Sequence, residues 1–416
     1  MNEFTYNSNS LYCENVSVNE LADKYGTPLY IYSRAAIEGQ IKSVATAFKE
    51  VSPLIAFSVK SNSNIGLLSV VKQAGAGADI VSGGELYRCL KAGISPQKIV
   101  FAGVGKSDEE IAYAIDNNIK LFNAESMEEM AAISRVAVSK KASANVSFRV
   151  NPDVDAKTHE KTTTGKKENK FGIPYEKAVE MYMAAAKLPG LIVSGIDVHL
   201  GSPIYTTEPY VAGINRLLPI IDELRKNGIP LKTLDIGGGI AIVYNDEKPF
   251  LPAELAEVTV PLIKKSGLEC ILEPGRFIAG NSGIMVSKVT YVKKTGYKNF
   301  VIVDAGMNDL IRPAFYGSYH GILPVVKNES RSNLKADVVG PICESSDCFA
   351  KDREIAEPLH GEYLSFMSAG AYGFTMASNY NTRRRPCELL VHGNKVSVIR
   401  KREEWADLIA GESVPE

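Results

Sequence analysis

The sequence has few of the features that mark secreted, membrane or metal-stabilised proteins. Its six cysteines are scattered without C-x-x-C pairs, and its five histidines show no H-E-x-x-H spacing, so neither a disulfide framework nor a metal is expected. No apolar run approaches the roughly 18 residues of a membrane span. Residues 1–10 are polar and lack the cationic and apolar regions of a signal peptide. These absences point to a cytoplasmic protein.

An excess of charge of one sign is also lacking. The net charge is -1 and charged residues make up 23% of the chain, so nothing favours binding to nucleic acid or to an anionic membrane. The Walker pattern of nucleoside triphosphate binding is absent as well. We therefore expect a small-molecule partner. The 416 residues exceed the roughly 250 to 300 at which single cores stop growing, which predicts two domains.

Between residues 34 and 280, short apolar or β-branched runs alternate with helical stretches. Eight runs have the character of strands: 54–59, 78–81, 98–102, 121–123, 145–150, 191–199, 231–236 and 270–273. Helices are expected between them, for example at 84–91, 108–117, 126–138, 175–187 and 209–226. A doubly wound sheet is the alternative, but it usually has fewer strands and a Gly-x-Gly-x-x-Gly turn after the first. The repeat predicts an α/β fold, a (β/α)₈ TIM-like barrel over 34–280.

After residue 280 the pattern changes to short alternating runs broken by Gly, Asn and Pro, which predicts a mainly antiparallel β domain over 281–416. Its strands are expected at 283–291, 300–304, 337–339, 363–367, 388–391 and 395–399. The N-terminal segment, 1–33, contains an apolar run at 28–32 that has no place in the barrel, so we expect it to join the β domain. Residues 153–170, rich in Lys, Thr and Gly, are expected to form a mobile loop over one face of the barrel.

The first predicted barrel strand ends on a lysine. The apolar run at 54–59 leads into Lys60, a polar Ser/Asn loop follows, and Asn64 has the position of a helix cap. An amine at the carboxyl end of a parallel strand can form a Schiff base with a carbonyl cofactor. Most lysines in such positions are solvated surface residues, so the rest of the chain must decide between the two interpretations.

Three further strand ends carry residues suited to chemistry. His199 ends the sixth run, Gly237-Gly238-Gly239 follows the seventh, and Glu273-Pro274-Gly275-Arg276 ends the eighth. Consecutive glycines let backbone N–H groups approach an anion. Each element has a plain structural alternative: a packed ring, a tight turn and a surface ion pair. Active sites of this fold lie at the carboxyl face, so their joint placement around Lys60 favours a phosphate-bearing cofactor.

Pyridoxal 5'-phosphate needs four kinds of protein group. These are a lysine for covalent attachment, an anion cradle, a carboxylate that keeps the pyridine nitrogen protonated, and a flat partner for the ring. Lys60, the glycine-rich loops, Glu273 and His199 supply one of each. The sequence therefore predicts a pyridoxal-phosphate enzyme.

At this point the chain resembles the fold-type III pyridoxal-phosphate decarboxylases over nearly its whole length, and most closely the members that act on diaminopimelate. The resemblance rests on ordered motifs, namely SVKSN at 58–62, DIVSGGEL at 79–86, RVNP at 149–152, KFGI at 170–173, HLGS at 199–202, DIGGG at 235–239, EPGR at 273–276, RP at 312–313, CES at 343–345 and SAGAYG at 368–373. The chain departs from the family at Ser61, where alanine is usual; this adjoins the lysine and leaves the chemistry intact.

The resemblance implies a role for each candidate residue. Lys60 carries the cofactor, His199 stacks on its ring and Glu273 pairs with its pyridinium nitrogen. The phosphate region is held by Ser202, Gly238, Gly239, Gly275, Arg276 and Tyr372. The substrate is bound by Arg276, Arg312, Tyr316, Glu344 and Tyr372, with Glu344 on its distal amine. Cys343 is the proton donor, so that Lys60, His199 and Cys343 are the catalytic residues.

The family also implies a homodimer whose active sites are shared between chains. The implied reaction is decarboxylation of meso-diaminopimelate to L-lysine and carbon dioxide, the last step of lysine biosynthesis. A dicarboxylic diamine needs a cation for the carboxylate it keeps and an acid for its free amine, and Arg312 and Glu344 supply both.

Four alternatives remain open at this stage. A decarboxylase of ornithine, arginine or a carboxylated polyamine would be expected to lack the Arg-Pro-x-x-Tyr pattern at Arg312 to Tyr316. A racemase needs two opposed proton-transfer groups, and only Cys343 can be assigned besides Lys60. An inactive regulatory relative would not need Lys60, Glu273 and Cys343 together. Finally, Cys343 and Cys348 can be thiols without any catalytic use.

Overall fold

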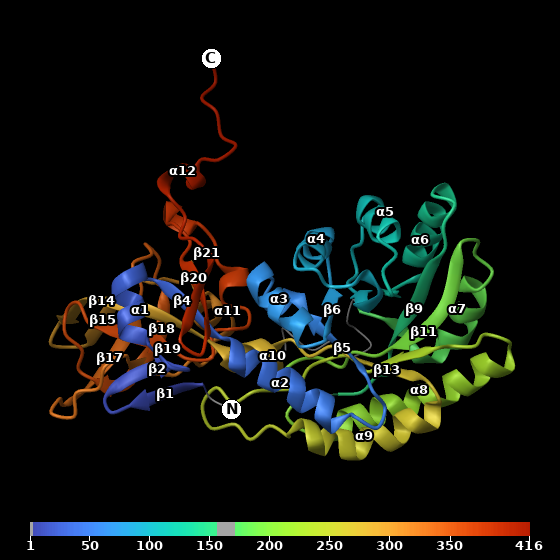
Figure 1. The fold of residues 1–416 in the computed structure, drawn as a ribbon, viewed down its shortest axis with the longest axis horizontal. Helices are drawn as coiled ribbons and strands as arrows, with labels where there is room; N and C mark the ends of the chain where they lie inside the picture. Colours follow the sequence, from blue (N-terminus) through green and yellow to red (C-terminus); the bar gives the residue numbers. More distant parts are fainter. Residues whose placement is uncertain (1–2, 156–170) are drawn as a thin grey trace. The chain divides into compact units, whose positions relative to one another are not determined.

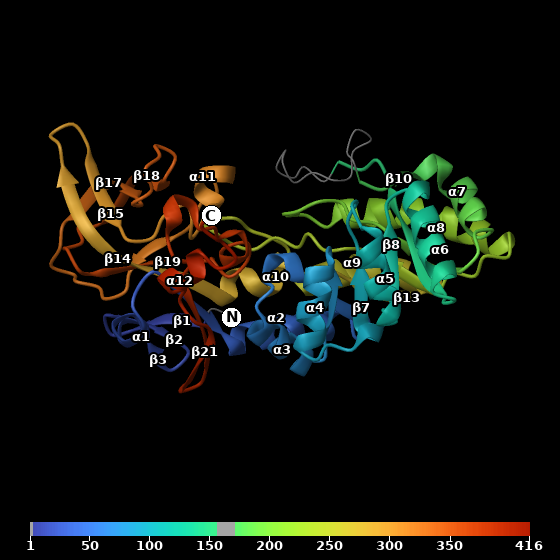
Figure 2. The ribbon, with the colours of Figure 1, turned by 90° about the horizontal axis from the view of Figure 1, so that it is seen from above.

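A computed structural model of the chain describes residues 3–155 and 171–416. The chain divides into two compact units (Figures 1 and 2). The barrel unit comprises Glu38–Ile242 and Lys248–Ile278, and the β unit comprises Met1–Ile37, Val243–Glu247 and Ala279–Glu416. The loop expected at 153–170 lies mostly outside the described residues.

The barrel unit contains a closed barrel of parallel strands. Its members are β5 (Leu54–Ser58), β6 (Gly77–Ile80), β7 (Ile99–Phe101), β8 (Leu121–Ala124), β9 (Ala144–Asn151), β11 (Leu191–Asp197), β12 (Thr233–Asp235) and β13 (Glu269–Leu272). They pair in the order β9-β11-β12-β13-β5-β6-β7-β8, and the β8–β9 pairing closes the ring. The two-residue β10 (Ile173–Pro174) adds to the edge of β9. All eight expected strands are present, so the predicted barrel is confirmed.

Helices follow the strands and lie around the barrel (Figure 1). They are α2 (Arg34–Ala47), α3 (Ile65–Gln73), α4 (Gly83–Lys91), α5 (Asp108–Asp116), α6 (Met127–Ser139), α7 (Ala178–Ala185), α8 (Glu208–Lys226), α9 (Pro252–Ser266) and α10 (Arg276–Ala279). Most bounds agree with the sequence within two residues. The exception is the helix expected at 175–187, which begins with a 3₁₀ turn and is α-helical only over Ala178–Ala185.

The barrel interior changes character along the strands. An apolar cluster of Ala56, Val100, Leu121 and Ile271 is fully buried. Charged and amide side chains occupy positions nearer to the carboxyl ends, as the next section describes.

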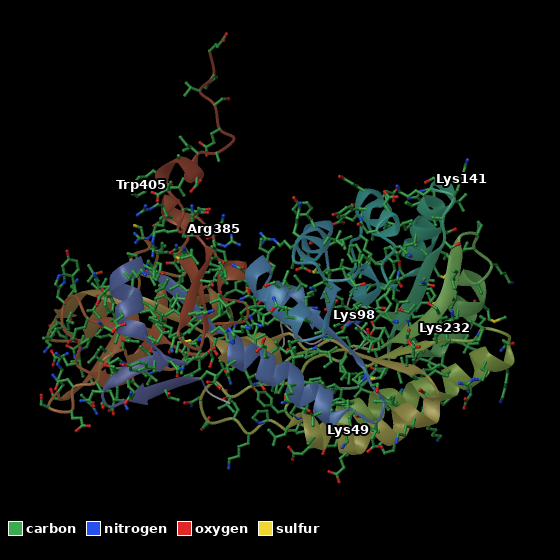
Figure 3. All side chains as sticks on the ribbon, in the orientation of Figure 1. Lys49, Lys98, Lys141, Lys232, Arg385 and Trp405 are labelled. Carbon is green, nitrogen blue, oxygen red and sulfur yellow. The ribbon has the colours of Figure 1, made fainter. Side chains whose placement is uncertain are left out.

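Lys49, Lys98, Lys141 and Lys232 are labelled in Figure 3. They precede β5, β7, β9 and β12 along the chain, so these lysines lie toward the amino ends of the parallel strands, away from Lys60.

The β unit is built on one large sheet. Its strands are β4 (Leu29–Ser33), β14 (Gly283–Lys294), β15 (Asn299–Val303), β16 (Ile322–Pro324), β17 (Asn333–Val339), β18 (Cys348–Ala356), β19 (Tyr363–Phe366), β20 (Cys387–His392) and β21 (Lys395–Arg400). The main path is β18-β17-β15-β14-β4-β20-β21, and β19 pairs with both β14 and β16. Most pairings are antiparallel as expected, but β15–β17 and β4–β20 are parallel. The sequence did not predict β16 and β18.

The N-terminal strand β4 lies inside this sheet, antiparallel to β14 and parallel to β20. A small sheet of β1 (Phe4–Asn7), β2 (Ser10–Cys13) and β3 (Val16–Ser17), with helix α1 (Val18–Tyr25), was not foreseen. Its apolar side chains share one core with β4, β14 and β20. All six cysteines are free thiols. Among the described residues, no helix combines the length and apolar character that crossing a membrane requires.

Candidate active site

Lys60 lies in a 3₁₀ turn (Val59–Ser61) that directly follows β5, so the predicted strand ends one residue earlier than expected. The turn is closed by Ser61, whose buried hydroxyl donates to the carbonyl of Ser58 at 2.7 Å. Asn64 caps α3 by accepting the N–H of Gly66 at 2.8 Å, as the sequence predicts. A strand on one side and a capped helix on the other thus fix the backbone that carries Lys60.

One partner of Lys60 in this structure is Asp79, near the end of β6. Its Oδ2 lies 3.5 Å from Lys60 Nζ, and its side chain is fully buried, whereas that of Lys60 is 39% exposed. Ser58 Oγ donates to the same oxygen at 2.8 Å. A buried carboxylate therefore holds the exposed amine at the carboxyl end of the barrel, which is where a carbonyl group can reach it.

His199 follows β11 by two residues, and Gly238 N donates to its Nδ1 at 3.2 Å. That bond requires an unprotonated Nδ1. Burial, with Arg149 and Lys60 nearby, also lowers the pKa of His199 well below its usual range. The ring is therefore neutral, and its 3.8 Å approach to Glu273 is not an ion pair. Arg149 fixes the backbone by donating to the His199 carbonyl at 3.1 Å.

The glycine loop after β12 is packed too tightly for side chains. A Cβ at Gly238 would overlap the carbonyl oxygen of Glu273, and one at Gly239, where φ is +98°, would overlap that of Gly201. Asp235 Oδ1 accepts the N–H of Gly237 at 2.9 Å. The loop therefore offers bare backbone at the carboxyl ends of β11 to β13, as an anion cradle requires.

Arg276 and Ser202 extend this cradle. Arg276 is the first residue of α10 and is 8% exposed, and its Nε donates to Ser202 Oγ at 3.3 Å. Gly275 approaches the Lys60 turn so closely that a Cβ would lie 2.8 Å from that of Ser58. A guanidinium, a hydroxyl and bare backbone in one place suit a phosphate.

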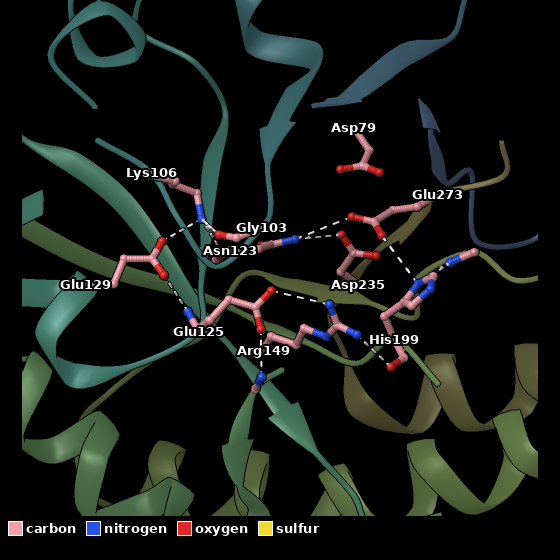
Figure 4. A network of polar contacts seen from close by, with 12 residues as sticks. Asp79, Gly103, Lys106, Asn123, Glu125, Glu129, Arg149, His199, Asp235 and Glu273 are labelled. Carbon is pink, nitrogen blue, oxygen red and sulfur yellow. Dashed lines mark hydrogen bonds and ion pairs between the residues drawn. The ribbon is translucent and has the colours of Figure 1, made fainter. Parts of the chain in front are cut away.

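Glu273 belongs to a buried acidic cluster (Figure 4). Oxygens of Asp197, Asp235 and Glu273 lie within 4.8 Å of one another. Asn123 Nδ2 donates to Asp235 at 3.2 Å and approaches Glu273 at 3.5 Å. Burial, reinforced by the neighbouring carboxyls, raises the pKa of all three acids well above the usual range. Such a cluster favours bound protons or a cationic partner, and the pyridinium of pyridoxal phosphate is one. These residues therefore fit that cofactor.

A second polar network supports the same end of the barrel (Figure 4). Glu125 accepts from Arg149 Nη1 at 3.3 Å with one oxygen and from Gly172 N at 2.6 Å with the other. Lys106, with a side chain only 1% exposed, pairs with Glu129 at 2.5 Å and donates to the Gly103 and Asn123 carbonyls. The network ties the loops after β7, β8 and β9 together.

The remaining expected site residues belong to the β unit. Arg312 begins α11 (Arg312–Tyr316) and is 5% exposed. Its guanidinium contacts His320 Nε2 at 3.0 Å, donates to Ser318 Oγ at 3.2 Å and lies 4.8 Å from the centre of the Tyr244 ring. His320 Nδ1 lies 2.8 Å from the Met367 carbonyl, an arrangement in which the ring donates there and accepts from Arg312. Arg312 is thus a preorganised cation.

Cys343 and Glu344 are exposed in the turn between β17 and β18. Hydrogen bonds from Ser346 and Tyr380 lower the pKa of Glu344, which favours its charged form. Tyr316, in the last position of α11, packs edge-on against Phe315 with ring centres 4.7 Å apart. Tyr372 has a left-handed backbone (φ +58°) in the turn at 368–373.

Within the barrel unit, the structure brings together all eight residues assigned to it: Lys60, His199, Ser202, Gly238, Gly239, Glu273, Gly275 and Arg276. Sequence reasoning gave no role to four buried polar residues beside them, Asp79, Asn123, Arg149 and Asp235. Their signal was available, because each is a polar or charged residue inside a predicted apolar strand, where an unpaired group would be costly.

Comparison with known proteins agrees with this geometry. Residues 34–280 match the family model described as "Pyridoxal-dependent decarboxylase, pyridoxal binding domain". The barrel, its β unit and this match define a pyridoxal-dependent decarboxylase.

The relatives narrow the class. The diaminopimelate decarboxylase of Vibrio cholerae is 45% identical over 100% of this chain and 99% of its own length. That of Neisseria meningitidis serogroup A is 48% identical over 97% and 99%. The crystal structure of the Helicobacter pylori diaminopimelate decarboxylase, complexed with L-lysine, has a TM-score of 0.91 at 41% identity, covering 94% of this chain and 98% of that one. The chain belongs to the diaminopimelate decarboxylase family.

Proposed function

We propose that this protein decarboxylates meso-diaminopimelate to L-lysine and carbon dioxide with pyridoxal 5'-phosphate as cofactor. One observation carries the proposal. An amine, a neutral imidazole and a buried acid (Lys60, His199 and Glu273) converge with a glycine-lined cradle at the carboxyl end of one barrel. The relatives support the same proposal, because they are named diaminopimelate decarboxylases.

The cofactor, when bound, withdraws the electrons that departing carbon dioxide leaves behind. Each residue has a defined task toward it. Lys60 attaches it, and Asp79 holds that amine in place beforehand. His199, in its neutral state, would stack on the ring. Glu273 holds the proton at the pyridine nitrogen. The phosphate is held by Ser202, Gly238, Gly239, Gly275, Arg276 and Tyr372.

The substrate is recognised by charge. Arg312 binds the carboxylate that diaminopimelate keeps, and Glu344 binds its distal amine. Arg276, Tyr316 and Tyr372 complete the site. Cys343 delivers a proton to the carbon from which carbon dioxide departs. The working unit is a cytoplasmic homodimer in which Cys343 and Glu344 serve the site of the partner chain.

The decisive experiment is incubation of the purified protein with meso-diaminopimelate, ornithine, arginine and lysine in parallel, with carbon dioxide as the measured product. We expect release from meso-diaminopimelate alone. Release from ornithine but not from diaminopimelate would contradict the proposed substrate. The Lys60→Ala variant is the matched control for cofactor-independent release.

The substrate assignment also predicts a specificity change in Arg312→Met. Losing a charge-assisted contact should cost binding of diaminopimelate about 2 kcal/mol or more, and should affect a monocarboxylic amino acid little. The measurement is kcat/KM for both kinds of substrate. Equal losses for the two would show that Arg312 is structural, as its packing against Tyr244 and His320 also permits.

A further inference from the structure

The turn that presents Cys343 and Glu344 has only two buried residues. It spans residues 340–347 between β17 and β18, and the four consecutive residues 343–346 are exposed. Ile342 is 6% exposed and Asp347 is 4% exposed. The position of the two exposed residues is therefore set by whatever holds these two anchors.

Asp347 joins the turn to a second loop. Its Oδ2 accepts the N–H of Ile342 at 2.7 Å, and its Oδ1 accepts the N–H of Met307 at 2.7 Å. Met307 lies in the loop between β15 and α11, the helix that begins with Arg312. One buried carboxylate thus connects the backbone before Cys343 with the backbone that leads to the substrate-binding arginine.

The two loops approach so closely that glycine is required at the crossing. A Cβ at Gly340 would lie 2.6 Å from the Cα of Gly306, and one at Gly306 would lie 2.7 Å from Ile342 Cγ1. This close approach lets both N–H groups reach the same carboxylate. Burial raises the pKa of Asp347, and the two N–H bonds oppose that shift by favouring the charged form.

A third segment fixes the other side of the turn. Asn381, with a left-handed backbone (φ +54°), accepts the N–H of Cys343 on its Oδ1 at 2.8 Å. Ser378 N donates to the Asn308 carbonyl at 2.9 Å, which connects this segment to the same loop as Met307. The consecutive N–H groups of Ile342 and Cys343 are therefore held by two side-chain acceptors, Asp347 and Asn381.

We infer that Asp347 is a positioning residue of the decarboxylase, acting with Asn381 to hold the turn that carries Cys343 and Glu344. The inference rests on the proposed function for the roles of those two residues. A carboxylate is needed because it accepts both N–H groups. An asparagine at 347 would accept only one, and its NH₂ group would face the other donor.

The test compares Asp347→Asn with Asp352→Asn, which changes an exposed aspartate on β18 of the same unit. For each cofactor-loaded variant, kcat and KM for meso-diaminopimelate, the thermal midpoint and the rate of Cys343 alkylation by iodoacetamide are measured, with Cys343→Ala as the alkylation blank. We expect Asp347→Asn to lower kcat at least tenfold and to raise the alkylation rate at least threefold, and Asp352→Asn to change neither.

If Asp347→Asn unfolds below the assay temperature, variants of the exposed Asn381 provide the test instead. Asn381→Gly removes the acceptor without backbone strain, and Asn381→Asp keeps an oxygen for the Cys343 N–H. We expect the first to repeat the loss of kcat and the faster alkylation, and the second to restore both. Wild-type kcat and alkylation rates in the folded variants would overturn the inference. The alkylation rate is independent of the proposed function, whose failure would appear instead as no release of carbon dioxide from meso-diaminopimelate by the wild-type protein.

Discussion

Buried acids determine the charge at the carboxyl ends of the barrel strands. Glu273 is 4% exposed and lies beside Asp235 and Asp197, so its charge depends on what approaches it. In the proposed reaction Glu273 must hold a proton at the pyridine nitrogen and keep a negative charge of its own. Asn123 donates toward both Asp235 and Glu273, and so orients the two carboxyl groups.

We therefore expect Glu273→Gln to reduce turnover far more than cofactor binding. A neutral amide fills the same space, but it cannot stabilise a protonated pyridine nitrogen, so the electron sink is lost in the transition state. The measurements are kcat at saturating cofactor and the cofactor dissociation constant from absorbance. An unchanged kcat would remove Glu273 from this role.

Glu85, in α4, provides a pH-dependent test at the same end of the barrel. Burial raises its pKa from 4.5 to about 7, while the Val81 N–H it accepts opposes the shift. Between these values the folded state keeps a proton that the unfolded state loses, so this group makes the folded protein less stable as pH rises from about 4.5 to about 7.

Glu85→Gln removes this pH-dependent loss of stability and keeps an oxygen that accepts the Val81 N–H. We expect the free energy of unfolding in urea, relative to wild type, to move in favour of the variant between pH 5 and pH 8. The matched control is the same change at Glu223, an exposed glutamate on α8. A parallel pH profile of Glu85→Gln and wild type would contradict the assigned pKa.

At the scale of elements, the barrel could be predicted because each strand combines an apolar run with a following polar loop. The β unit was predicted less completely. β18 carries Lys351, Asp352, Arg353 and Glu354 and lies at the edge of its sheet, so its sequence lacks the apolar alternation of a half-buried strand. The strands β1 to β3 are two to four residues long, too short for any periodic pattern.

The same limit applies to the candidate site. Lys60, His199, Glu273 and the glycine loop could be found because they follow predicted strands. The partners of Asp79 and Asp235 could not be assigned, because their pairing with Lys60 and Glu273 depends on the order in which the strands close the barrel. The anchors around Cys343 depend on loops that are distant in sequence, such as Met307 and Asn381.

The helix cap beside Lys60 provides a prediction at this scale. Asn64→Ala removes the oxygen that accepts the Gly66 N–H and should lower the free energy of unfolding by about 1 kcal/mol. Asn64→Ser keeps a capping oxygen and should recover most of that loss. Urea unfolding measures both variants. Equal stabilities for the alanine and serine variants would show that the cap does not hold α3.

At the scale of the whole molecule, the proposed homodimer with shared sites predicts complementation. Lys60 belongs to the barrel unit and Cys343 to the β unit, about 280 positions further along the chain. If Cys343 serves the partner's Lys60, a dimer of one Lys60→Ala chain and one Cys343→Ala chain has one intact site and one doubly damaged site.

The two variants, each nearly inactive alone, are mixed in equal amounts and allowed to exchange subunits. Random pairing makes half of the dimers mixed, and one of the two sites in each mixed dimer is intact, so roughly a quarter of wild-type activity should return. Subunit exchange is verified independently with differently tagged chains. A second mixture, of tagged wild-type and tagged Lys60→Ala chains, is the control for effects of the tags. No recovery despite verified exchange would mean that each chain supplies both residues to its own site.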